Sequence, residues 1–218
     1  MQPATLTISS KTYSSWSMRG WLLCRLAGLD FVERIQPIDD PSTRAELLHL
    51  SPSFLVPALT IDGMKIWDTL AIGETLNEMF PGSGVLPEER PKRAHCRSVS
   101  GEMHLGFYNL RSAMPMNLKA HYPGFKIWGG AQGDIERVTE IWRDCLQKHG
   151  GPFLFGSRPT MADAMFAPVC TRFITYDVKL DDASAKYCRT VRAWPAVGEW
   201  YTGAAQEPDE LEELDAEF

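Results

Sequence analysis

The chain has 218 residues, of which 44% are hydrophobic, 23% charged and 11% aromatic, a balance typical of a folded globular protein. This balance excludes a disordered, collagen-like or disulfide-stapled chain, and the formal net charge of −6 argues against nucleic acid as a partner because phosphate binding needs a basic face. Much of the acidic excess lies in the stretch EPDELEELDAE, residues 207–217, which we expect to be a solvated and frayed tail.

The cysteines and the hydropathy pattern predict a cytoplasmic protein without a membrane or metal partner. Five widely spaced cysteines form no CxxC pair, so reduced thiols are expected. No apolar run approaches 18 residues, and the first 15 residues lack the apolar core of a signal peptide. The five histidines show no HxxxH spacing, and the glycines fit no nucleotide-binding motif, so neither a metal nor a nucleotide is expected.

The first 80 residues are predicted to alternate strands and helices in the order βαβαββα. The dipeptide Asp62-Gly63 indicates a tight hairpin turn, and Gly28 indicates the end of the first helix. The expected strands are 4–9, 31–37, 56–61 and 65–67, and the expected helices are 18–28, a short one within 39–50, and 69–80.

The rest of the chain is predicted to be helical. Residues 81–93 are rich in proline, glycine and charge, which is typical of an interdomain linker. Apolar residues then recur at three- and four-residue spacing in segments 90–120, 131–149, 160–176, 183–192 and 194–204. We therefore expect a small α/β domain at 1–82 followed by an all-α domain at 90–218.

The loop from Tyr13 to Arg19 joins the first strand to the first helix and carries three adjacent hydroxyl groups. A helix start has free N–H groups and a positive dipole end, which favour anions, including a thiolate. Ser14 can therefore either cap the helix or donate a hydrogen bond to a bound thiolate. The residues alone leave both interpretations open.

Two further pieces of sequence suit a peptide-like ligand. Pro57 stands at the start of a strand, where we expect the Val56–Pro57 bond to be cis and the Val56 backbone to pair with the ligand. Asp68 and Thr69 open a helix, where they are expected as N-cap residues and can also hold the charged head of an α-amino acid.

Together these pieces resemble the glutathione S-transferase superfamily, in its bacterial, serine-type form, over essentially the whole chain. The loop SSWSMR is most similar to that of the zeta class, from which it differs by Trp16 in place of a cysteine, and WDTLAI has a threonine where serine is usual. The segments LSPSFLVPAL and FLFGSRPTMADAMFAP also match, the latter with a capping box from Thr160 to Asp163.

The resemblance implies a thioredoxin-like α/β domain that binds glutathione, followed by an all-helical domain that binds the second substrate. Position by position, it implies that Ser14 stabilises the glutathione thiolate, Ser15 assists, Val56 and Pro57 hold the cysteinyl part, and Asp68 with Thr69 holds the γ-glutamyl end. It also implies a homodimer with glutathione as co-substrate.

Substrate residues are expected on the first helices of the second domain. His104, Phe107, Tyr108 and Arg111 would share roughly one helical face, and Tyr108 and Arg111 are the candidates for substrate contact. Arg172 lies in a helix expected to be buried. Both arginines are either structurally paired or available for an anionic group of the substrate.

The expected function is conjugation or addition of the glutathione thiolate to a small electrophile. The alternatives are a glutathione-dependent cis–trans isomerase of the maleylacetoacetate type, and a non-catalytic binding module that keeps the fold.

Overall fold

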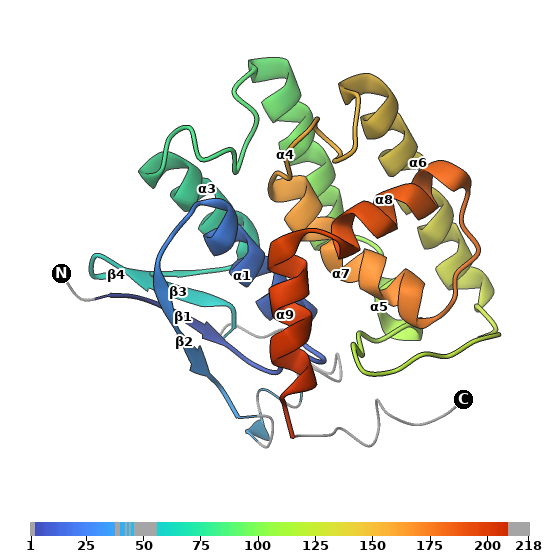
Figure 1. Ribbon diagram of the computed structural model, residues 1–218, viewed down its shortest axis with the longest axis horizontal. Coiled ribbons are helices and arrows are strands. Elements are labelled where there is room, and N and C mark those ends of the chain that lie inside the picture. The colour runs from blue at the N-terminus through green and yellow to red at the C-terminus, as the bar shows by residue number, and fades with distance from the viewer. Residues whose placement is uncertain (1–2, 38–39, 42, 44, 46–55, 209–218) are drawn as a thin grey trace.

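A four-stranded sheet is the framework of the first half of the chain, in a computed structural model that describes residues 3–37, 40, 41, 43, 45 and 56–208. The strand order is β2-β1-β3-β4 (Figure 1). Strand β1 (Ala4–Ile8) pairs in parallel with β2 (Phe31–Ile35) and antiparallel with β3 (Ala58–Ile61). Strand β3 pairs antiparallel with β4 (Met64–Trp67) through the predicted hairpin, where Asp62 and Gly63 both have positive φ.

Two helices of this half pack against each other beside the sheet. Helix α1 (Ser15–Leu26) ends before Gly28, which has the predicted positive φ of 68°, and contacts both β1 and helix α3 (Thr69–Met79). The apolar side chains of α1 and of the inner strands, including Leu6, Ile8 and Leu22, are fully buried. This core fixes the position of the α1 N-terminus.

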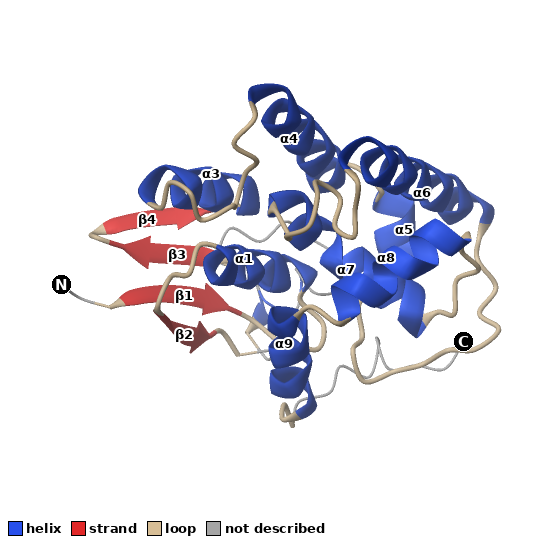
Figure 2. Cartoon of the chain, turned by 45° about the horizontal axis from the view of Figure 1, so that its top comes forward, coloured by secondary structure: helices blue, strands red, loops and turns tan. Residues whose placement is uncertain are grey.

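The second half is helical, as predicted. Its helices are α4 (Arg90–Leu105), α5 (Tyr108–Ala113), α6 (Gly129–His149), α7 (Met161–Thr175), α8 (Asp182–Arg192) and α9 (Pro195–Ala205). Helix α7 lies centrally and contacts α1, α4 and α8 (Figure 2). Near the start of α7, the fully buried Asp163 carboxylate accepts hydrogen bonds from the Thr160 N–H at 2.8 Å and the Tyr187 hydroxyl at 3.0 Å. The predicted capping box is therefore present.

Some predicted boundaries differ in the structure. The segment predicted as one helix at 90–120 divides into α4 and α5 at Gly106 and Phe107. A Cβ atom on Gly106 would lie 2.7 Å from the Glu102 carbonyl oxygen, and Phe107 has a left-handed φ of 59°. The last residues of the predicted linker belong to α4. Most of the helix predicted within 39–50, and the first six residues of LSPSFLVPAL, fall outside the described residues.

The described end of the chain packs against the loop before α1. The Glu207 carboxylate accepts hydrogen bonds from the Ser10 hydroxyl at 2.8 Å, the Thr12 N–H at 2.9 Å and the Thr12 hydroxyl at 2.8 Å. The expectation of a frayed tail was therefore wrong for Glu207, because its carboxylate has these partners. The part of the tail beyond residue 208 lies outside the described residues.

Within the described ranges, no helix combines the length and the apolar character needed to cross a lipid bilayer.

Candidate functional site

Ser14 is the N-cap of α1. Its Oγ accepts a hydrogen bond from the Ser17 N–H at 3.3 Å and donates one to the Ser17 Oγ at 2.9 Å. Ser17 Oγ also accepts from the Ser9 N–H at 3.0 Å. The hydroxyl proton of Ser14 is thus engaged within the loop, which matches the capping interpretation of this residue.

Ser15 is placed differently, although it is the next residue. It is the first residue of α1, it is buried, and its Oγ accepts a hydrogen bond from Arg172 Nη2 at 3.3 Å. Among the described residues nothing accepts its own hydroxyl proton. A hydroxyl that receives a hydrogen bond from a cation is polarised, so Ser15 has a proton available for an anion at the helix start.

The Val56–Pro57 bond is cis, as predicted, and lies directly before β3. Val56 and Pro57 are buried, and Gly20 of α1 approaches Pro57 so closely that a Cβ atom on Gly20 would lie 2.6 Å from the Pro57 Cβ. The absence of a side chain on α1 at this point lets Pro57 pack against the middle of the helix. The Val56–Pro57 segment therefore packs against α1, the helix that Ser14 caps and Ser15 begins.

Asp68 caps α3, and Thr69 follows it. Asp68 Oδ1 accepts from the Leu70 N–H at 2.8 Å and the Ala71 N–H at 3.2 Å, and Oδ2 contacts Nε2 of His104. Burial opposes ionisation of this carboxyl, but the hydrogen bond and charge of His104 together with the helix N–H groups prevail, and its pKa is lowered. Asp68 is therefore an anion that already has one partner from the second domain.

The role of His104 was not predicted from the sequence. It extends from α4 to Asp68, and its ring lies 5.2 Å from the ring of Trp16, centroid to centroid. Trp16, the departure from the zeta-class loop, therefore lies between the two domains and contacts the histidine that pairs with Asp68.

Three arginines, Arg19, Arg111 and Arg172, surround Trp16 and Ser15, and we call them the arginine cluster. The Arg19 guanidinium lies 4.6 Å and that of Arg111 5.4 Å from the Trp16 ring centroid. Arg172, which bonds Ser15, also donates from Nε to the Met114 carbonyl at 2.8 Å. Arg19 is the member that sequence reasoning missed, although the SSxSxR pattern contains it.

The arginine cluster has unused hydrogen-bond donors. Arg19 is fully buried and donates from Nε to the Met165 carbonyl at 2.8 Å, while its Nη1 and Nη2 have no partner within the described part of the chain. Nε of Arg111 is likewise buried without a described partner. Buried donors without acceptors are costly, so these groups are suited to bind an anionic group that enters the site.

Mutual repulsion among the three guanidinium groups adds to the cost of their unpaired donors. Burial and repulsion by Arg111 lower the pKa of Arg172 to about 9, and burial with repulsion by both other arginines lowers the pKa of Arg19. Asp134 attracts Arg111 electrostatically, but burial outweighs it, and the pKa of Arg111 is lowered too. The arginine cluster is thus a concentration of positive charge beside Ser15, which an anion would stabilise.

Tyr108 does not join the other predicted substrate residues in one helical face, because the helix is broken before it. Its side chain is 62% exposed and makes no hydrogen bond to a described residue, although its phenol acts electrostatically on Arg111. Arg111 and Arg172 do come together, from α5 and α7.

Comparisons with known proteins identify both halves of the chain. The family model of the glutathione S-transferase N-terminal domain matches residues 13–79, and that of the C-terminal domain matches residues 109–203. Among curated relatives, maleylacetoacetate isomerase of Rattus norvegicus is 31% identical over 77% of this chain and 78% of its own length. A probable maleylacetoacetate isomerase of Caenorhabditis elegans is 29% identical over 72% of this chain and 73% of its own length.

Solved structures share the fold. A glutathione transferase homologue from Burkholderia with bound glutathione has a TM-score of 0.70 at 22% identity, covering 95% of this chain and 100% of its own. The maleylacetoacetate isomerase of Anaeromyxobacter dehalogenans, with bound dicarboxyethyl glutathione and citrate, has a TM-score of 0.67 at 23% identity. That comparison covers 96% of this chain and 95% of the other.

Proposed function

The chain belongs to the glutathione S-transferase family, and from that premise we propose that it is a glutathione-dependent cis–trans isomerase of the maleylacetoacetate type. The sequence motifs favoured conjugation and kept isomerisation as an alternative. The names of the relatives reverse this order, because several of them are maleylacetoacetate isomerases. The substrate would be a small conjugated molecule that carries carboxylate groups.

The observation that carries this proposal is the arginine cluster beside Ser15. A substrate that ends in carboxylates would accept hydrogen bonds from the free donors of Arg19 and Arg111 and would relieve the repulsion among the guanidinium groups. A neutral electrophile would leave both costs in place. An acidic substrate therefore suits this site better than a neutral halogenated aromatic.

Glutathione, when bound, supplies a thiolate that adds reversibly to the conjugated cis double bond, so that the bond can rotate before the thiolate leaves. Ser15, at the helix start that Ser14 caps, would hold the thiolate by hydrogen bonding, and the positive end of α1 would favour its charge. Asp68 and Thr69 would bind the γ-glutamyl end, and Val56 and Pro57 the cysteinyl part. No atom is lost or gained in the net reaction, since the thiolate is regenerated.

The proposal is tested by assaying glutathione with a maleyl diketo acid and, separately, with a halogenated aromatic. We expect isomerisation of the acid, detected as the trans product by NMR, and a reduction of at least tenfold in Arg111→Gln, which removes the charge from a partly buried position. Conjugation of the aromatic without isomerisation would contradict the proposal and support a conjugating transferase. Calorimetric binding of glutathione with neither activity would instead support a binding module.

Three further expectations from the sequence concern the domain bounds, the number of copies and the compartment. We propose that the domains run from 1 to 82 and from 90 to 218, that two copies form a homodimer, and that the protein acts in the cytoplasm. The family match supports the first two, because transferases of this family are typically two-domain dimers.

A further inference from the structure

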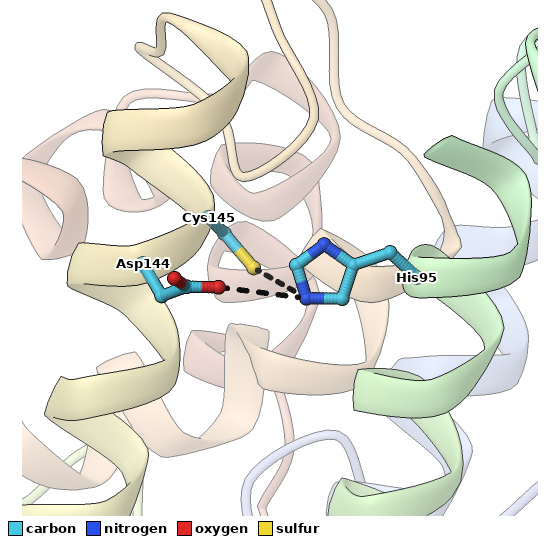
Figure 3. Close-up of side chains that lie close together, drawn as sticks. All are labelled: His95, Asp144 and Cys145. Atoms are coloured by element: carbon cyan, nitrogen blue, oxygen red, sulfur yellow. Dashed lines mark hydrogen bonds and ion pairs between the residues drawn. The ribbon is translucent and has the colours of Figure 1, made fainter. Parts of the chain in front are cut away.

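A second cluster of chemically active side chains lies between α4 and α6. It consists of His95 on α4 and of Asp144 and Cys145, which are adjacent on α6. Figure 3 shows the side chains of Asp144 and Cys145 both directed toward the His95 ring. His95 precedes His104 by nine residues, which places it about 13 Å along α4 from the contact with Asp68. Spacing along the sequence gave no indication of this cluster, because its members come from helices about 50 residues apart.

The distances in this cluster suit a shared cation better than direct hydrogen bonds. His95 Nε2 lies 3.7 Å from Asp144 Oδ2 and 4.0 Å from Cys145 Sγ, and both lines in Figure 3 meet at this one nitrogen. Ligands bound to tetrahedral zinc at about 2.0–2.3 Å lie roughly 3.3–3.8 Å from one another. The three ligand atoms all lie within 4.8 Å of one another, so a contraction of at most about 1 Å would bring them to zinc-ligand geometry.

His149 orients the histidine of the cluster. Its Nε2 lies 3.1 Å from His95 Nδ1, and its ring stacks on Phe155 at 4.7 Å between centroids. A neutral His149 ring can accept a hydrogen bond at Nε2 from His95 Nδ1–H. That hydrogen bond leaves the lone pair of His95 Nε2 directed at the carboxylate and the thiol. His149 is thus the hydrogen-bond partner that holds the ring of the proposed ligand His95 in place, as is usual for a metal-ligating histidine.

We propose that His95, Asp144 and Cys145 form a zinc-binding site, with a fourth position open to water. The set of nitrogen, sulfur and carboxylate donors is the one that zinc prefers. A surface hollow of about 430 Å³, lined in part by His95 and Asp144, exposes these two ligands to solvent, whereas Cys145 is fully buried. The site is distinct from the glutathione site and is independent of the isomerase proposal.

Binding would release one proton. A free cysteine thiol is mostly protonated at neutral pH, whereas a zinc-bound cysteine is a thiolate. Zinc would form a bond to Sγ, and the thiol proton would pass to solvent. The ligands would then carry two negative charges against the two positive charges of zinc. Lys148, which pairs with Asp144 Oδ1 at 2.8 Å, competes for the carboxylate, so we expect micromolar rather than picomolar affinity.

Calorimetric titration of the tag-free protein with zinc chloride, without glutathione or chelators, tests the proposal. We expect one zinc ion per chain and, with a pH indicator in weak buffer, release of about one proton. Cys145→Ser should bind zinc at least tenfold more weakly and lose the proton release. His149→Gln should weaken binding about 10- to 100-fold, since it removes the partner that orients His95. Cys188→Ser and His121→Gln, which leave the cluster intact, should bind as the wild type does.

Absence of zinc binding at 100-fold excess over a micromolar protein sample, or equal affinity in the wild type and Cys145→Ser, would overturn the proposal. If Cys145→Ser does not fold, the wild type alone decides the question. Cobalt(II) bound at this site should give a thiolate-to-cobalt charge-transfer band in the near ultraviolet, and a cobalt complex without that band would show that Cys145 is not a ligand.

Discussion

Among single residues, the adjacent serines at the start of α1 differ most in what their hydroxyl protons can do. Ser14 donates to Ser17 Oγ, whereas Ser15 accepts from Arg172 and has its proton free with respect to the described residues. The family resemblance placed Ser14 first and Ser15 second. The hydrogen bonds favour the opposite order for contact with a thiolate.

We therefore predict that Ser15→Ala raises the pKa of the thiol of bound glutathione by about one unit or more, because a hydrogen bond to a charged group contributes ~1.5–3 kcal/mol. Ser14→Ala should mainly remove the helix cap and lower the free energy of unfolding by ~0.5–2 kcal/mol. The thiol pKa is measured by ultraviolet absorbance of the thiolate against pH, and the unfolding energy by urea titration. A large pKa change in Ser14→Ala with none in Ser15→Ala would mean that Ser14, and not Ser15, contacts the thiolate.

The lowered pKa of Asp68 predicts how stability depends on pH. A carboxyl whose folded-state pKa is below its unfolded value of ~3.9 stabilises the fold above that value, and the contribution is lost as the pH falls through the folded pKa. Asp68→Asn should thus lose less stability than the wild type between pH 4 and pH 2. The difference should be below about 1 kcal/mol, because the side chain is 39% exposed.

Urea titrations at several pH values measure this difference. Asp30→Asn, an exposed change before β2, is the matched control and should follow the wild type. If Asp68→Asn also follows the wild type through this range, the pairing of Asp68 with His104 and the α3 N–H groups does not stabilise the fold.

At the scale of elements, the approach of α1 to the proline loop depends on one glycine. A Cβ atom on Gly20 would lie 2.6 Å from Cβ and 2.7 Å from Cγ of Pro57, both in a rigid ring. We predict that Gly20→Ala lowers the free energy of unfolding by about 1–3 kcal/mol through overpacking and also weakens glutathione binding, because Pro57 must move.

Gly198→Ala is the matched control for this change. Gly198 lies within α9, and a Cβ atom there would meet nothing within 4 Å, so alanine should be neutral or should stabilise by ~0.5–1 kcal/mol. Thermal unfolding and calorimetric titration with glutathione measure both effects. Equal stability of the two variants would mean that the Pro57 loop adjusts without cost.

The elements were predictable where the signal is local. The hairpin at Asp62-Gly63, the helix end at Gly28 and the cap at Asp163 each depend on a few neighbouring residues, and all three are present. The break at Gly106 was missed because the apolar spacing continues across it, and the left-handed backbone of Phe107 that follows has no sequence signal. Arg19 and His104 were missed as functional residues because their roles depend on partners in the other half of the chain.

For the whole molecule, exposed apolar side chains indicate where a second copy could pack. Trp67 on the edge strand β4 is 52% exposed, and Leu105 at the end of α4 is 84% exposed. Large apolar groups left in water are costly and are typical of interfaces. We predict a homodimer, with a mass by light scattering at micromolar concentration of twice that of one chain.

Trp67→Ser should shift this dimer toward single chains, because it removes a large apolar contact from the interface. Trp128→Ser, an exposed tryptophan at the start of α6, is the control and should leave the mass unchanged. A mass near that of one chain for the wild type would contradict the dimer. Equal masses for the two variants would place the interface elsewhere.

The hydrogen bonds of Glu207 also bear on how the protein is made. Thr12 and its acceptor Glu207 are 195 positions apart, with Thr12 in the loop that leads into the serines of α1. At a synthesis rate of ~5–20 residues per second, the ribosome produces Glu207 roughly 10–40 s after Thr12. Throughout that interval the nascent first domain lacks the carboxylate that accepts the hydrogen bonds of this loop. The amino-terminal site is thus completed only when nearly the whole polypeptide has been translated.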